Sequence, residues 1–165
     1  MATIADVVKM WNARMQENTN LQVYKVDGGV GFIRLSTNPS VDRQDIKSAV
    51  HYLFIEGAGE GDFKVRFQID KNYAYSNANS EKVCKFLEKN FRGQKVYNKR
   101  VKFWTDGNGS PNYFLKLGVC DLNGKPQLNG FPSSSSAKEL CDAMEQFIKL
   151  TQEKITKYLL TGKED

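Results

Sequence analysis

Few residues of this chain could catalyse a reaction, and the most suggestive are those of the triplet Asp62-Phe63-Lys64. In metal-dependent nucleases two carboxylates hold Mg²⁺ and a lysine lies beside the attacking water. Asp45 is at a permissible spacing to supply the second carboxylate. However, Asp62 and Lys64 fall on the solvent side of an alternating strand pattern, and such a triplet is expected by chance in a chain of this composition. We therefore predict a protein that is not an enzyme, with a metal-dependent nuclease as the weaker alternative.

Histidine and cysteine are too few or too widely spaced for other catalytic or metal-binding arrangements. His51 is the only histidine, which excludes two-histidine phosphodiesterases, HExxH metalloproteases and multi-histidine metal sites. It lies in a strand-like run over 50–55, where a structural role is expected. Cys84, Cys120 and Cys141 form no CxxC pair, so we expect buried free thiols. Neither a metal nor a cofactor is predicted.

Positive charge is concentrated between Glu81 and Lys102. This segment carries a net charge of +6, whereas the whole chain carries +5. A chain of this size would meet a polyanion at such a segment. Its cations are Lys82, Lys85, Lys89, Arg92, Lys95, Lys99, Arg100 and Lys102. The first three are expected to form an outward stripe on a helix whose other face is apolar.

Basic and aromatic residues also share the polar side of two predicted hairpins. They are Lys25, Phe32 and Arg34 in the first hairpin, and Arg100, Lys102, Trp104, Phe114 and Lys116 in the second. If helices cover only the apolar side of the sheet, the cations can hold phosphates and the rings can stack unpaired bases. The alternative is that Phe32, Trp104 and Phe114 are core residues under a helix or loop, with the lysines at a solvated rim.

These patterns favour a non-enzymatic protein that binds nucleic acid, with single-stranded DNA or RNA preferred. The binding surface would combine the basic helix stripe with the basic and aromatic hairpin face.

No apolar run approaches the ~20 residues that a membrane span needs, and the N-terminus lacks a signal-peptide pattern. A cytoplasmic location is therefore expected.

The first half of the chain predicts a helix over 3–15, a hairpin over 21–36 and strands over 49–56 and 62–70. In the hairpin, Gly28 and Gly29 form the turn. The resulting register pairs Val26 with Gly31 and Tyr24 with Ile33. It places Tyr24 on the same face as Ile33 and places Val23 on the opposite face.

The second half predicts a helix that starts at 77–80, a hairpin with strands over 95–105 and 112–120, and a final helix from Ser136 to about Leu160. The element order is α-β-β-β-β-α-β-β-α. Its natural architecture is a single α+β domain over 1–165, with an antiparallel curved sheet of about six strands and helices packed on one face.

The final helix, about 25 residues and therefore roughly 37 Å long, exceeds what a small sheet usually covers. We expect Ile155, Tyr158 and Leu159 near its end to be available to another chain. This supports an alternative function as a protein-binding module, such as a chaperone or a small inhibitor of a partner protein, and a possible homodimer. The competing expectation is that the helix curves along the chain's own elements and buries these residues.

Overall fold

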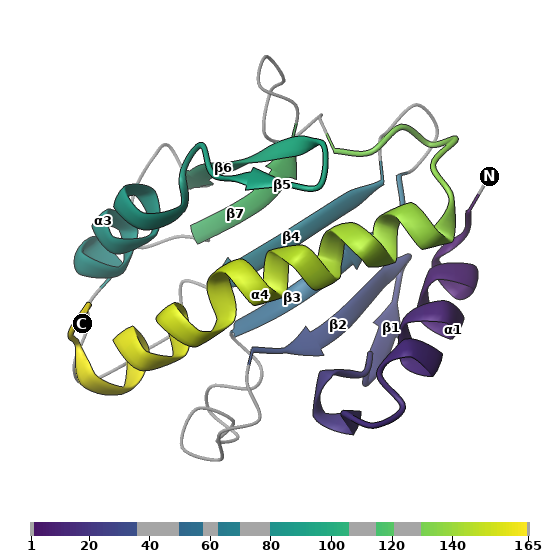
Figure 1. Ribbon diagram of the computed structural model, residues 1–165, viewed down its shortest axis with the longest axis horizontal. Helices are drawn as coiled ribbons and strands as arrows, with labels where there is room; N and C mark the ends of the chain where they lie inside the picture. The colour runs from purple at the N-terminus through teal and green to yellow at the C-terminus, as the bar shows by residue number, and fades with distance from the viewer. Residues whose placement is uncertain are drawn as a thin grey trace.

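The computed structural model describes residues 2–35, 50–57, 63–69, 80–105, 115–120 and 130–164, with the backbone alone at residues 80, 105, 115, 116 and 120. Its helices are α1 (Ile4–Arg14), α3 (Ser80–Phe91) and α4 (Ala137–Thr161), and η1 (Thr19–Leu21) is a short 3-10 helix (Figure 1). The strands are β1 (Lys25–Asp27), β2 (Val30–Arg34), β3 (Val50–Ile55), β4 (Lys64–Ile69), β5 (Lys95–Val96), β6 (Lys99–Thr105) and β7 (Leu115–Cys120).

All seven strands form one antiparallel sheet in the order β1-β2-β3-β4-β7-β6-β5. The predicted α+β class is confirmed, and the element order matches except for one strand. The extra strand arises because the run over 95–105 is not continuous. The chain turns at Tyr97, whose φ is +58°, and folds back so that β5 pairs with β6.

The first helix begins as the sequence predicts. The Thr3 hydroxyl accepts a hydrogen bond from the Asp6 backbone N–H, and the Asp6 carboxylate accepts one from the Thr3 N–H. This reciprocal cap satisfies two N–H groups that lack helical partners. Val7 and Trp11 are fully buried, and the Trp11 indole N–H donates to the Leu21 carbonyl over 2.7 Å. The helix is thereby fastened to η1.

The first hairpin has the predicted turn and register, but its faces change before Lys25. Gly28 and Gly29 have φ of +58° and +79°, and Val26 is opposite Gly31. Val23 is buried in the core, whereas Tyr24 is 39% exposed. The predicted faces of these two residues are therefore wrong. The Val23 N–H donates to the side-chain oxygen of Asn12 of α1 over 2.8 Å, whereas the Tyr24 N–H donates to the Phe32 carbonyl over 3.0 Å.

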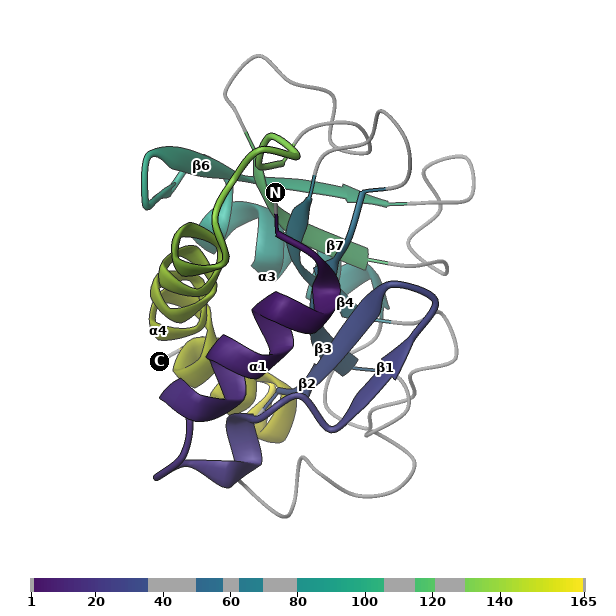
Figure 2. The ribbon, with the colours of Figure 1, turned by 90° about the vertical axis from the view of Figure 1, so that its right-hand side faces the viewer.

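The three described helices lie on the same side of the sheet, as predicted (Figure 2). The core forms between the helices and that side of the sheet. Tyr52 of β3 and Phe147 of α4 meet edge to face with ring centroids 5.7 Å apart. None of the described helices combines the length and apolar character needed to cross a membrane.

The end of α4 does not present an exposed apolar stripe. Ile155, Tyr158 and Leu159 are all buried within the chain itself. The Tyr158 ring stacks on Phe86 of α3, so α3 extends the helical layer and covers the part of α4 that a small sheet would leave bare. The expectation that these three side chains are available to another chain is wrong, and the competing expectation of internal burial is correct.

Candidate nucleic-acid interface

The face of the sheet that is turned away from α1, α3 and α4 is called the outer face below. Among the residues that the structure describes, no helix lies on it (Figure 2). The strand registers place two rows of neighbouring residues across this face. One row runs Lys25, Phe32, Leu53, Arg66, Gly118 and Lys102, and the next runs Arg34, His51, Gln68, Lys116 and Trp104.

At the β1–β2 edge of the outer face, cations lie over aromatic rings. The Arg34 guanidinium is 4.3 Å from the centre of the Tyr24 ring, and the Lys25 Nζ is 5.3 Å from the centre of the Phe32 ring. Attraction between a cation and the negative face of a ring holds both groups in place. These contacts confirm that the polar side of the first hairpin carries both kinds of residue.

His51 lies behind these two pairs of side chains. Its Nε2 shares a hydrogen bond of 2.5 Å with the Tyr24 hydroxyl, and its ring meets the Phe32 ring edge to face with centroids 5.2 Å apart. The His51 side chain is only 8% exposed. Burial raises the pKa of the Tyr24 hydroxyl, and the charge of Arg34 opposes that rise. His51 is therefore buried beside the Tyr24 and Phe32 rings.

A third contact between a cation and a ring lies farther along the outer face. The Arg66 guanidinium of β4 is 5.1 Å from the centre of the Trp104 ring of β6. These residues come from strands that are separated by β7, which contributes Gly118 between Arg66 and Lys102. Because glycine has no side chain, Trp104 has room to extend over β7 toward Arg66.

Burial differs between the middle of the outer face and its β1–β2 edge. His51, Leu53 and Arg66 in the middle are 8%, 4% and 9% exposed. Lys25 and Tyr24 at the edge are exposed, and Phe32, Arg34, Lys102 and Trp104 are half-buried. A ligand can therefore reach the rim of the outer face more readily than its middle.

The basic stripe of α3 is exposed, but its charges are largely paired. Lys85 forms an ion pair with Glu81 at 3.2 Å, Lys89 with Glu164 at 3.4 Å, and Arg92 with Glu88 at 2.9 Å. Lys82 is exposed as well. Since α3 belongs to the helical layer, the stripe and the outer face lie on opposite sides of the sheet. The structure does not bring them together into one surface.

The remaining predicted cations lie around β5 and β6. Lys95 is exposed at the β5 edge, and the Arg100 Nη1 donates to the Gly93 carbonyl over 3.1 Å just beyond the end of α3. The Lys99 Nζ lies 5.0 Å from the centre of the Phe131 ring. It is opposite the core residue Val96 and is therefore not on the outer face. Phe114 and the side chain of Lys116 lie outside the described residues.

The predicted nuclease site is not assembled within the described residues. Asp45 and Asp62 lie outside them, and Lys64 is half-buried on β4. In the same part of the chain, no group of three or more histidine, cysteine, aspartate or glutamate residues could hold a metal ion. Of the predicted thiols, Cys141 is buried and Cys84 is only half-buried. Cys120 has no described side chain.

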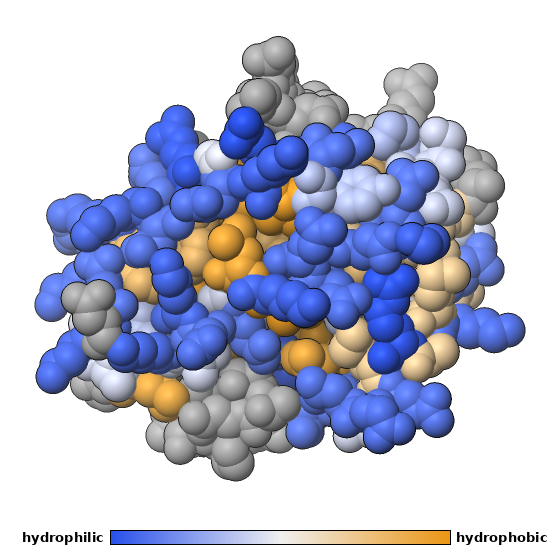
Figure 3. Space-filling view, in the orientation of Figure 1, coloured by the Kyte–Doolittle hydropathy of each residue, from blue (hydrophilic) through white to orange (hydrophobic). Residues whose placement is uncertain are grey.

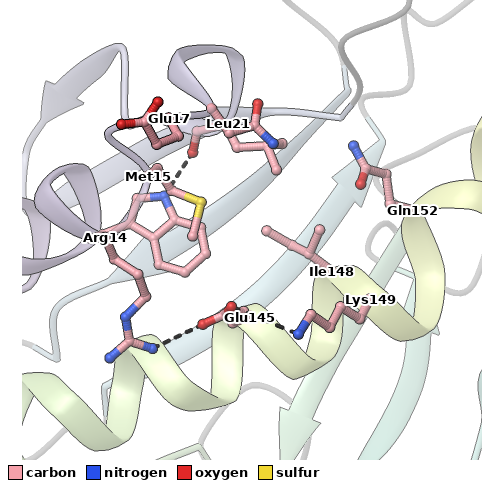
Figure 4. Close-up of a pocket in the computed structure, with 10 residues that line it drawn as sticks. Arg14, Met15, Glu17, Leu21, Glu145, Ile148, Lys149 and Gln152 are labelled. Atoms are coloured by element: carbon pink, nitrogen blue, oxygen red, sulfur yellow. Dashed lines mark hydrogen bonds and ion pairs between the residues drawn. The ribbon is translucent and has the colours of Figure 1, made fainter.

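A pocket of about 300 Å³ lies on the helical side, between the end of α1, η1 and the middle of α4 (Figure 4). Its apolar lining comes from Trp11, Met15, Leu21 and Ile148. At its rim, Arg14 pairs with Glu145 at 3.1 Å, and Lys149 approaches the same carboxylate at 3.8 Å. Hydrophilic side chains dominate the surface of this side (Figure 3). The pocket is large enough to enclose one apolar side chain.

Comparisons with known proteins give no family: no protein-family model, no curated protein and no solved structure matches the chain. The candidate site therefore rests on geometry alone. Three of its members, Tyr24, His51 and Arg66, were not among the predicted binding residues. Arg66 has a readable signal, because it lies on the polar side of a strictly alternating strand. Tyr24 has no such signal, since strict alternation places it on the face opposite Phe32.

Proposed function

We propose that the protein binds single-stranded nucleic acid, DNA or RNA, through the outer face, without catalysing a reaction. The carrying observation is the set of three contacts between cations and rings on that face, Arg34 with Tyr24, Lys25 with Phe32, and Arg66 with Trp104. A cation that lies over a ring supplies a positive charge for a phosphate. The flat groups of the same pair supply a stacking surface for the base that is attached to that phosphate.

The distribution of carboxylates favours the outer face over the α3 stripe. Within the described ranges, Lys25 and Arg34 have no carboxylate partner, whereas Lys85, Lys89 and Arg92 each have one. A phosphate that approaches α3 must compete with glutamates that are already in place. Although each exposed pair contributes only about 0 to 1 kcal/mol, the same carboxylates also repel the ligand.

Single strands suit the site better than duplexes do. Stacking on a protein ring requires a base whose face is free, and the bases of a duplex are covered by their neighbours. Within the described residues, the outer face also presents no helix that could enter the major groove. We accordingly expect weak, charge-driven binding to duplex DNA and tighter binding to single strands.

Two matched charge reversals test the proposal. One variant carries Lys25→Glu, Arg34→Glu and Lys102→Glu on the outer face, and the other carries Lys82→Glu, Lys85→Glu and Lys89→Glu on α3. Both change the net charge equally, so a difference between them reports position. Fluorescence anisotropy with a labelled ~20-mer single strand should give salt-dependent binding that only the first variant abolishes. Absence of binding at low salt would refute the proposal, provided that circular dichroism finds the wild type folded.

The second candidate function, a protein-binding module that acts through α4, now depends on the pocket beside Trp11 and Ile148. A homodimer through Ile155, Tyr158 and Leu159 would first require the end of α4 to detach from α3. The variant Ile148→Glu would block the pocket. If it abolished binding of a partner and left nucleic-acid binding intact, the partner would bind in the pocket.

We retain the cytoplasmic location as part of the main proposal.

The nuclease alternative has a direct test. Incubation of the protein with plasmid DNA and RNA in Mg²⁺ or Mn²⁺ should produce no cleavage. Cleavage that Asp62→Asn or Lys64→Ala abolishes, with folding intact, would replace the binding function by hydrolysis.

A further inference from the structure

We propose that the β1–β2 edge of the outer face holds two consecutive, unstacked nucleotides, with one base on the Tyr24–Arg34 pair and its neighbour on the Phe32–Lys25 pair. This inference rests on the proposed function and names the part of the outer face that recognises bases. It also gives His51 a role, as the residue that positions both rings. The accessibility, spacing and charge of these five residues support this arrangement.

The side chains at the β1–β2 edge are the most accessible to a base among the three contacts between cations and rings. A ligand can reach Tyr24 and Lys25, which are exposed, and Phe32 and Arg34, which are half-buried. The Arg66 guanidinium, by contrast, belongs to a side chain that is only 9% exposed. The contact of Arg66 with Trp104 therefore offers less surface to a base than the two contacts at the edge do.

The spacing of the rings requires a strand whose bases are separated. The Tyr24 and Phe32 ring centroids are 6.5 Å apart, and the ring planes are inclined by 53°. Successive bases in a stacked strand are only about 3.4 Å apart and nearly parallel. Two neighbouring bases can therefore occupy both rings only after they unstack from each other. Single strands permit this at low cost, which explains the expected preference over a duplex.

The cations next to these rings can hold the phosphates that accompany the bases. Within the part of the chain that the structure describes, neither Arg34 nor Lys25 has a carboxylate partner. The guanidinium plane of Arg34 also offers a stacking surface of its own, because bases stack on arginine as well as on aromatic rings. Each pair thus combines one charge with one flat group.

His51 fixes the geometry of both rings from below. It shares a hydrogen bond with the Tyr24 hydroxyl, and its ring lies edge to face against Phe32. A buried side chain that contacts both rings reduces the entropy that they lose when bases bind. Because His51 is only 8% exposed, we assign it as a positioning residue and not as a contact of the ligand.

A nucleic-acid strand that lacks its bases distinguishes recognition of bases from simple attraction between charges. Anisotropy is measured with a ~20-mer of thymidine and with an abasic strand of the same length and charge. We expect the thymidine strand to bind at least about tenfold more tightly, since each stacked base contributes ~1 to 3 kcal/mol. Equal binding of both strands would overturn the inference and leave the proposed function standing. Binding of neither strand would refute the proposed function itself.

Ring variants locate the bases. Tyr24→Leu and Phe32→Leu should each reduce the preference for thymidine over the abasic strand, whereas Trp104→Leu, the matched loss of a ring elsewhere on the outer face, should preserve it. The opposite pattern would overturn the inference. Tyr24→Phe keeps the ring and removes only the hydrogen bond with His51, so it should retain most of the preference.

His51→Gln tests the positioning role. It should lower the preference for thymidine while affinity for the abasic strand stays unchanged, a result that general loss of stability would not produce. Polyglutamate, added as a competitor, tests whether the site binds acidic peptides instead of nucleic acid. Displacement of the thymidine strand at an equal concentration of charge would assign the site to acidic peptides and overturn the inference.

Discussion

The rings of Phe86 and Tyr158 lie parallel, with centroids 4.1 Å apart and planes inclined by only 6°. This contact joins α3 to the last turns of α4, which are separated from it by more than sixty residues of sequence. It makes the end of α4 part of the core, because Ile155 and Leu159 beside it are buried as well.

Truncation after Thr151 should therefore destroy the fold. The shortened chain loses Ile155, Tyr158 and Leu159 and exposes the apolar face of α3, so we expect loss of cooperative unfolding in a thermal melt followed by circular dichroism. Truncation after Gly162 is the control and should preserve a cooperative transition. A fragment ending at Thr151 that still melted cooperatively would contradict the assignment of these residues to the core.

Substitution of Phe147 by alanine should lower the free energy of unfolding by about 3 to 5 kcal/mol. The ring is fully buried and meets Tyr52 edge to face, so its removal leaves a cavity between α4 and the sheet. Urea denaturation measures the change. Glu153→Ala, an exposed position on the same helix, should change the stability by less than about 0.5 kcal/mol.

The Tyr52 hydroxyl depends on Thr151 for its hydrogen bond. The Thr151 hydroxyl donates to the Phe147 carbonyl over 2.7 Å, so the Tyr52 hydroxyl must be the donor in their contact of 2.7 Å. Burial raises the pKa of Tyr52, and the hydrogen bond with Thr151 opposes that rise. Thr151→Val should cost about 1 to 3 kcal/mol, because it leaves a buried hydroxyl without an acceptor. The double variant with Tyr52→Phe should cost less than the sum of the single changes. An additive result in urea denaturation would show that the contact contributes nothing.

The local signals of this fold could be read from the sequence, and the non-local ones could not. Thr3, Asp6 and the two glycines of the first hairpin act on residues a few positions away, and their predictions are confirmed. The pairing of β4 with β7 joins segments about fifty residues apart. Alternation says which residues of a strand share a face, but it does not say which strand lies beside it.

The candidate site likewise has a local part that the sequence reveals and a non-local part that it does not. Lys25, Phe32 and Arg34 belong to a single hairpin, so alternation alone places them on one face. The contact of Arg66 with Trp104 needs the order of three strands and a glycine in the middle one. The charge count over 81–102 finds cations but not their partners, and Glu164, which pairs with Lys89, comes from the far end of the chain.

Asp142 should make the stability depend on acidic pH. The hydrogen bond from Lys138, reinforced by Arg14, lowers the pKa of the Asp142 carboxyl in the folded protein. A lowered pKa stabilises the fold above the unfolded value of about 3.9, and this contribution disappears as the pH falls through the folded value. Asp142→Asn should therefore cost about 1 kcal/mol or less at pH 7 and a smaller amount at pH 2. A cost in urea denaturation that is equal at both pH values would contradict the ion-pair explanation.

Cys141 should react with thiol reagents only when the protein opens. Its side chain is fully buried between α4 and α1, and the Sγ donates to the Val7 carbonyl over 3.7 Å. Burial raises its pKa to about 11, so the thiolate that attacks such reagents is scarce at pH 8. In a variant with Cys84→Ser and Cys120→Ser, which leaves one thiol, we expect labelling by Ellman's reagent at least about a hundredfold slower than in urea. The Trp11→Phe change, which loosens α1 by removing the hydrogen bond to Leu21, should accelerate the reaction. Native labelling as fast as in urea would contradict the packing of α1 against α4.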